Sequence, residues 1–145
     1  MNKKTILKVC IALVIGSGLF FIVNHLTQPP TTEGQKEITI LISAPDYFNE
    51  ITVTTDTLTL GGLLAELSEQ GILSITLDGS SGDVFGRTLV EISGHQTVDW
   101  TSGPWWVFNS PNNQSCLEAG FCAGIDQTPI TDGDIFEFEF ISSFD

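Results

Sequence analysis

The stretch "TLGGLLAELSEQG", residues 59–71, decides the fold, because here the apolar pattern changes from the alternation of a strand to the period of a helix. Its leucines recur at i, i+3, i+4 and i+7, a spacing that forms one apolar stripe on a helix. They are Leu60, Leu63, Leu64 and Leu67. Gly71 follows where a helix C-terminal cap is expected. The stretch therefore predicts one helix with one buried face.

Segments on both sides of this helix alternate apolar with polar residues, which is typical of half-buried strands. Two predicted strands precede the helix and four follow it: 37–44, 50–56, 72–78, 86–94, 104–110 and 134–142. Pro45 and Asp46 supply turn chemistry between the first two, which predicts a hairpin. This order of elements predicts an α+β fold, in which one helix packs on one mixed, β-grasp-like sheet.

The last predicted strand, "DIFEFEFIS", shows which face is buried. Its phenylalanines alternate with isoleucines and glutamates. Because alternate residues point to opposite faces of a strand, we expect Phe136, Phe138 and Phe140 in the core. Burial of each ring contributes about 1.5–3 kcal/mol. The preceding "TDGD", residues 131–134, predicts a turn into this strand.

An uncharged apolar run at 9–26 follows three lysines near the N-terminus. A helix of this length roughly matches the ~30 Å core of a bilayer. A cleaved signal peptide is the alternative, but its apolar region is usually about 7–15 residues and ends at a small-x-small site, which is missing here. Lysines that flank a membrane helix usually stay on the cytoplasmic side, so the part of the chain after the helix is expected outside. We therefore predict a signal anchor in residues 1–26, a single-pass transmembrane helix that contacts the cell membrane through residues 5–26.

Residues 27–36 have the polar, proline-containing composition of a linker, which leaves 37–145 as one extracytoplasmic domain. All 18 acidic residues lie beyond the apolar run, where Lys36 and Arg87 are the only basic ones, so this part carries a net charge of −16. Such a field repels nucleic acid. We expect no nucleic-acid partner and interpret the acidity as solubility and mutual repulsion at a cell surface.

Cys116 and Cys122 lie on the oxidising side of the membrane and close a small loop. We predict a structural disulfide, which stabilises by about 2–3 kcal/mol in the chain-entropy model. A metal site needs more ligands, and neither His25 nor His95 has metal-like spacing to the pair. No metal site is predicted. The chain also has no G-x-S-x-G motif, and we expect no enzymatic activity.

Trp105 and Trp106 are adjacent on a predicted strand and must face opposite sides of it. One of them belongs to the core together with Phe108 or Val107. The other is exposed, at an edge, or covered by the disulfide loop. The functional hypothesis is an aromatic platform for a flat or apolar ligand, which Trp100 would join. Our candidate ligand-binding residues are Trp105, Trp106, Trp100 and Phe108.

Three segments form a combined motif: the helix at 59–71, "GPWWVFN" at 103–109, and "GIDQTPITDGDIFEFEF" at 124–140. Together they resemble the bacterial transcobalamin-like C-terminal domain family, a family of unknown function. Its members share a tryptophan-rich strand, a glycine-containing loop and a Gly-Asp dipeptide that opens the last strand. The matching residues here are Trp105 with Trp106, Gly124, and Gly133 with Asp134. The resemblance covers about residues 37–142.

The resemblance implies a β-grasp-like fold akin to the smaller domain of animal cobalamin carriers, which closes over one face of the corrinoid while a helical domain holds the other. Family members are often anchored at the bacterial surface. The loop 109–122 is longer than the family's usual turn and adds the cysteine pair. We expect a membrane-anchored binding domain for a small ligand such as a corrinoid, with no other cofactor. The alternative is a surface protein-protein interaction or structural module without a small ligand.

Overall fold

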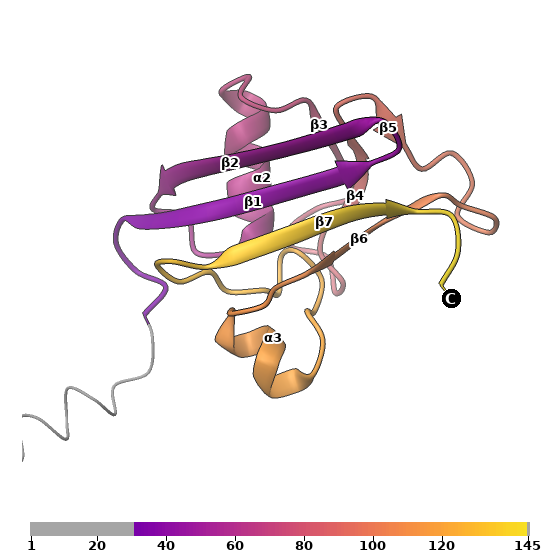
Figure 1. Ribbon diagram of the computed structural model, residues 1–145. Helices are drawn as coiled ribbons and strands as arrows, with labels where there is room; N and C mark the ends of the chain where they lie inside the picture. The colour runs from indigo at the N-terminus through magenta and orange to yellow at the C-terminus, as the bar shows by residue number, and fades with distance from the viewer. Residues whose placement is uncertain (1–30, 145) are drawn as a thin grey trace, which may run out of the picture. The chain divides into compact units, whose positions relative to one another are not determined.

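The computed structural model describes residues 31–144, which fold into one α+β unit of two sheets and two helices (Figure 1). The predicted membrane helix and the first part of the predicted linker fall at residues 1–30, outside the described residues. Between residues 31 and 144, no helix is both long and apolar enough to cross a membrane. The α+β class is confirmed.

Four strands form the larger sheet: β1 (Lys36–Ala44), β2 (Tyr47–Thr55), β6 (Trp105–Asn109) and β7 (Ile135–Ile141). They lie side by side in the order β2-β1-β7-β6 (Figure 1). The central pair β1 and β7 is parallel, and the two outer pairs are antiparallel. The predicted hairpin joins β1 to β2, and Asp46 adopts a positive φ of 59° in its turn. The sheet is therefore mixed, as expected.

Three short antiparallel strands form a second sheet: β3 (Ile75–Asp78), β4 (Thr88–Ile92) and β5 (His95–Gln96). The prediction of a single sheet is therefore wrong. Alternation identifies 72–78 and 86–94 as strands, but it carries no information about which strands pair. Here these two segments pair with each other, with a register shift between Thr76 and Leu77.

Helix α2 (Leu60–Glu69) confirms the predicted helical segment. The Thr59 hydroxyl caps its N-terminus by accepting a hydrogen bond from the N–H of Gly62 at 3.2 Å. Gly71 follows the helix with a φ of 68°, the left-handed conformation that ends many helices. All four leucines of the predicted stripe are 2% exposed or less. The helix therefore buries the face that its sequence period indicates.

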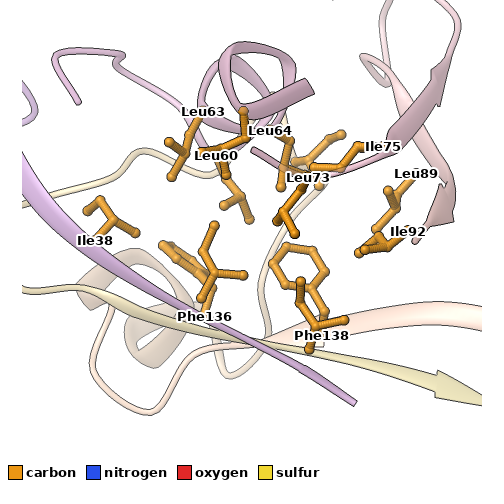
Figure 2. Packing of buried hydrophobic residues seen from close by; sticks show 14 of the residues in the cluster. Ile38, Leu60, Leu63, Leu64, Leu73, Ile75, Leu89, Ile92, Phe136 and Phe138 are labelled. Carbon is orange, nitrogen blue, oxygen red and sulfur yellow. The ribbon is translucent and has the colours of Figure 1, made fainter. Parts of the chain in front are cut away.

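The core lies between α2, the second sheet and the inner face of the four-stranded sheet (Figure 2). Phe136 and Phe138 point from β7 toward the leucines of α2 and are 0% and 1% exposed. Phe140 is partly buried against the same cluster, so the predicted inward face of the last strand is confirmed. The opposite face, which bears Glu137 and Glu139, is open to solvent. One face of the sheet therefore packs in the core, and the other is exposed to solvent at Glu137 and Glu139.

A second, short helix, α3 (Gln114–Ala119), lies where the apolar pattern predicts none. The prediction of a single helix is wrong in this respect, because a six-residue helix with one buried side chain has no apolar period to detect. Cys116 on α3 is bonded to Cys122, with an S–S distance of 2.05 Å. The predicted disulfide is thus confirmed, and it closes the end of this helix.

Candidate functional site

An open hollow of about 190 Å³ lies between β4, β6 and the loops that follow β3, β5 and α3. We call it the aromatic pocket, and its lining residues are Phe85, Arg87, Thr88, Leu89, Trp100, Trp106, Phe108, Gly124 and Ile125. Aromatic and aliphatic side chains make up most of this lining, and Arg87 is its one charged residue. Small-molecule sites commonly have this composition, in which a few polar groups orient a largely apolar ligand.

Three of the four predicted ligand-binding residues meet at the aromatic pocket. Trp106 and Phe108 extend into it from β6, and Trp106 is only 8% exposed. The Phe108 ring stacks on Phe138 of β7, with 5.5 Å between the ring centroids. Trp100 and Phe85, by contrast, come from loops and are 53% and 84% exposed. The pocket therefore combines a packed aromatic floor with two rings that reach solvent.

Trp105, the fourth predicted residue, does not line the pocket. It lies opposite Ile141 on the outer face of the four-stranded sheet, and its ring packs 4.9 Å from that of Phe144. Of the alternatives left open for the second tryptophan, cover by the disulfide loop is therefore not the one observed. Cys122 lies beside Asn109, at the other end of β6 from Trp105.

An ion pair between Arg87 and Asp126 holds one wall of the pocket, with side chains 19% and 6% exposed. Nε and Nη2 of Arg87 donate to the two carboxylate oxygens at 3.0 and 2.6 Å, and the Arg87 backbone N–H donates at 2.7 Å. The side-chain hydrogen bonds from Arg87 lower the pKa of Asp126, and the same bonds raise the pKa of Arg87. Within residues 31–144, Nη1 of Arg87 makes no hydrogen bond, so it remains available to a ligand.

Two glycines give Asp126 room beside α2. A Cβ atom on Gly61 would lie 2.1 Å from Oδ1 of Asp126, and a Cβ atom on Gly86 would lie 2.7 Å from the Asp126 Cβ. The N–H of Gly61 also donates to the carbonyl of Ile125 at 2.9 Å. The first turn of α2 therefore docks the loop that forms part of the pocket. Sequence reasoning missed this role of Gly61 and Gly86, because the loop that contains Asp126 lies far along the chain.

A buried polar cluster lies beside α3, away from the pocket. Asn113 and Asp134 are 1% and 3% exposed, and Nδ2 of Asn113 donates to the Asp134 carboxylate at 2.6 Å and to the Pro129 carbonyl at 2.9 Å. Asp134 also accepts hydrogen bonds from the N–H and hydroxyl of Thr131. These contacts close the turn before β7, so Asp134 has a structural role. In the part of the chain that the structure describes, no group of three or more His, Cys, Asp or Glu residues is arranged to hold a metal ion.

No protein-family model and no curated protein matches this chain. Solved structures do resemble it. A protein from Ruminococcus gnavus, described as a candidate metal-binding protein, is 25% identical, with 75% of this chain and 99% of that chain covered and a TM-score of 0.53. Haptocorrin in complex with Cbi is 10% identical, with 82% of this chain covered and a TM-score of 0.58.

The likeness to haptocorrin supports a transcobalamin-like fold. Identity at this level shows the fold alone. The chain spans 28% of the haptocorrin chain, so it corresponds to one part of that larger protein.

Proposed function

We propose that residues 31–144 form a non-enzymatic binding domain that holds a flat, largely apolar small molecule, such as a corrinoid, at the aromatic pocket. The exposure of Phe85 and Trp100 beside the buried ring of Trp106 carries this proposal. Rings left in water add nothing to folding stability through burial. At the mouth of an apolar hollow they offer stacking area to a ligand.

The size of the pocket supports contact with one part of a ligand. At about 190 Å³ it is smaller than the roughly 300–1,000 Å³ of pockets that enclose drug-sized molecules. A larger flat ligand would therefore rest one face or edge on Trp100 and Phe85 and leave the remainder outside. Haptocorrin, of which this chain spans 28%, was solved with Cbi bound, which supports a corrinoid as the kind of ligand to test.

Charge narrows the class of ligand. In the sequence beyond the N-terminal apolar run, 18 acidic residues stand against Lys36 and Arg87, and this field repels anions. Asp126 neutralises most of the Arg87 charge, but Nη1 remains a hydrogen-bond donor. We therefore favour a neutral or cationic ligand that presents an acceptor, such as an amide carbonyl, to Arg87.

Isothermal titration calorimetry of the full chain in detergent, with cobinamide and with cobalamin, tests this proposal. We expect the unmodified protein to bind at least one of them. Trp100→Ala should weaken binding about tenfold, because a stacked ring is worth about 0.5–1.5 kcal/mol beyond its buried area. Phe85→Ala should weaken it in the same direction.

Phe48→Ala is the matched control for these two variants. Phe48 is 67% exposed, as the pocket rings are, but it lies on the outer face of the four-stranded sheet. Its removal should leave corrinoid affinity unchanged. No binding of either corrinoid at high concentration would contradict the ligand, and an unchanged affinity in Trp100→Ala would contradict the pocket.

The outer face of the four-stranded sheet favours a second candidate function, a contact with another surface protein. A shallow hollow of about 300 Å³ lies there, and its lining includes Leu41, Phe48, Glu137 and Glu139. Charge complementarity then selects a basic surface as the partner. A partner retained from membrane extracts by the unmodified protein, lost at high salt and lost in Phe48→Ala would support this function, provided that corrinoid binding is unaffected. Isolation of the chain as a lone monomer would count against it.

We also propose that residues 5–26 anchor the chain in the cell membrane, with the binding domain outside the cytoplasm. The uncharged run after three lysines supports an anchor, and the disulfide agrees with an oxidising compartment. Alkaline extraction of membranes followed by protease treatment of intact cells tests both points. Release of the chain by alkali, or protection of the domain from protease, would contradict the proposal.

A further inference from the structure

Two neighbouring tryptophans hold the segment that leads to the pocket. The indole N–H of Trp106 donates to the carbonyl of His95 at 2.8 Å, and that of Trp105 donates to the carbonyl of Trp100 at 3.0 Å. Adjacent residues of a strand point to opposite faces. The two bonds therefore reach residues 95–100 from opposite faces of β6 and fasten this segment at both ends.

The Trp105 ring has a defined place on the outer face. It lies opposite Ile141 and packs on Phe144, with 4.9 Å between the ring centroids. Gly103 has a φ of 72°, and a Cβ atom there would lie 2.7 Å from atoms of the Trp105 ring, so a glycine is required for this contact. These neighbours orient the indole N–H toward the Trp100 carbonyl.

The turn that contains Trp100 is closed by its own hydrogen bonds. The Asp99 carboxylate accepts from the N–H of Thr101 at 2.8 Å and from the hydroxyl of Ser102 at 2.7 Å. The Asp99 carbonyl accepts from the N–H of Gly103 at 2.8 Å. These bonds lie within the turn and do not join it to the sheet. Among the described residues, one hydrogen bond joins Trp100 to the sheet, and the indole N–H of Trp105 donates it.

We infer that Trp105 is a positioning residue of the aromatic pocket. It acts through the carbonyl of Trp100 and fixes the turn so that the Trp100 ring stands at the pocket with Trp106 and Phe85. A ring that is already held loses less conformational freedom when a ligand stacks on it, which favours tight binding. The effect on affinity rests on the proposed function, whereas the placement of Trp100 does not.

Fluorine NMR of the full chain labelled with 5-fluorotryptophan tests the placement without a ligand. Trp105→Phe keeps an aromatic ring on the outer face and removes the donor. We expect the Trp100 resonance to shift and broaden, while the Trp106 resonance keeps its shift because its bond to His95 is intact. Trp100→Phe and Trp106→Phe assign the resonances. An unchanged Trp100 resonance in Trp105→Phe overturns the inference.

Corrinoid titration gives the second measurement. Trp105→Phe should weaken cobinamide or cobalamin binding about two- to tenfold, the effect of one side chain that must be ordered on binding, with little change in melting temperature. Phe144→Ala loosens the Trp105 ring but keeps its donor, so we expect a smaller loss in the same direction. Equal affinities of Trp105→Phe and the unmodified protein overturn the inference. If the unmodified protein binds neither corrinoid, the proposed function fails, and the Trp100 resonance alone decides the inference.

Discussion

Phe136 and Phe138 lie under α2 with 0% and 1% of their surface exposed, whereas Phe85 and Trp100 at the aromatic pocket are 84% and 53% exposed. The first two belong to the inner face of a central strand, where α2 and the second sheet cover them. The other two stand on loops that no further layer covers. Both regions hold aromatic residues, so the element that carries a ring, and not its aromatic character, decides whether the ring is buried in the core or exposed at the pocket.

The largest change in the free energy of unfolding is expected for a substitution in the core. Phe138→Ala should lower the free energy of unfolding by about 3–5 kcal/mol, because it removes a fully buried ring and leaves a cavity. Denaturant unfolding of the full chain, followed by circular dichroism, measures the loss. Phe85→Ala, at an exposed ring, is the control. Similar losses of stability in the two variants would contradict the statement that the core ring stabilises the fold and the pocket ring does not.

An intermediate effect is expected where the two regions meet, at the ion pair between Arg87 and Asp126. Asp126→Asn should cost about 2–4 kcal/mol, because it leaves the largely buried guanidinium without its charge partner. Thermal or denaturant unfolding measures this cost. Asp83→Asn, at an exposed carboxylate that accepts a hydrogen bond from the N–H of Ser80, is the matched control and should cost far less.

The same ion pair makes stability depend on pH in a defined direction. Hydrogen bonds from Arg87 place the pKa of folded Asp126 below the roughly 3.9 of an unfolded chain. This contribution is therefore fully present above about pH 4 and is lost as the pH falls through the lower folded value. Unfolding curves recorded at decreasing pH should show a smaller acid loss in Asp126→Asn than in the unmodified protein. Parallel curves would mean that other carboxylates carry the acid sensitivity.

The disulfide should have a somewhat smaller effect, and only on stability. Replacing Cys116 and Cys122 together by serine should cost about 2–3 kcal/mol, the value for a short closed loop. Corrinoid affinity should remain, because neither cysteine lines the pocket and the turn held by Trp105 lies at the other end of β6 from Cys122. Reductant should destabilise the unmodified protein to a similar degree and leave the serine variant unchanged. A loss of affinity in that variant would show that the disulfide positions the loop at Gly124 and Ile125, which lines the pocket.

The smallest stability change is expected at the pocket rim. Trp100→Ala should change the free energy of unfolding by no more than about 0.5 kcal/mol, as is usual for an exposed side chain. The same variant is expected to lose ligand affinity. Parallel unfolding and titration experiments compare the two properties directly. A large loss of stability would show that the exposed ring supports the fold after all.

Much of the fold could be predicted because its signals are local. The period of the leucines at 60–67 and the alternation of Phe136, Phe138 and Phe140 identify α2 and β7 together with their buried faces. The division into two sheets could not be predicted, because apolar alternation is the same whichever neighbour a strand has. Helix α3 was missed because its order comes from a side-chain cap, Asn113, and a disulfide rather than from an apolar stripe.

The candidate site could be predicted only in part. Strand geometry places Trp105 and Trp106 on opposite faces but does not say which one is inside. The register with β7 decides, since Trp106 lies opposite Phe140 and Trp105 lies opposite Ile141. Phe85 was missed because a lone aromatic residue in a glycine-rich loop gives no periodic signal.

The parallel pairing of β1 and β7 would have a mechanical consequence in a chain anchored through its N-terminal segment, as proposed above. The described chain enters the sheet at Lys36, the first residue of β1. This strand pairs with β2 along its whole length and with β7 from Thr39 to Ser43. The Lys36 amine, with the residue only 2% exposed, is bonded to the carbonyls of Thr32 and Gly34, which fixes the incoming segment. A pull from the N-terminal side would therefore load two ladders of hydrogen bonds in shear at the same time. This geometry resists force better than an edge strand, whose bonds would open one after another.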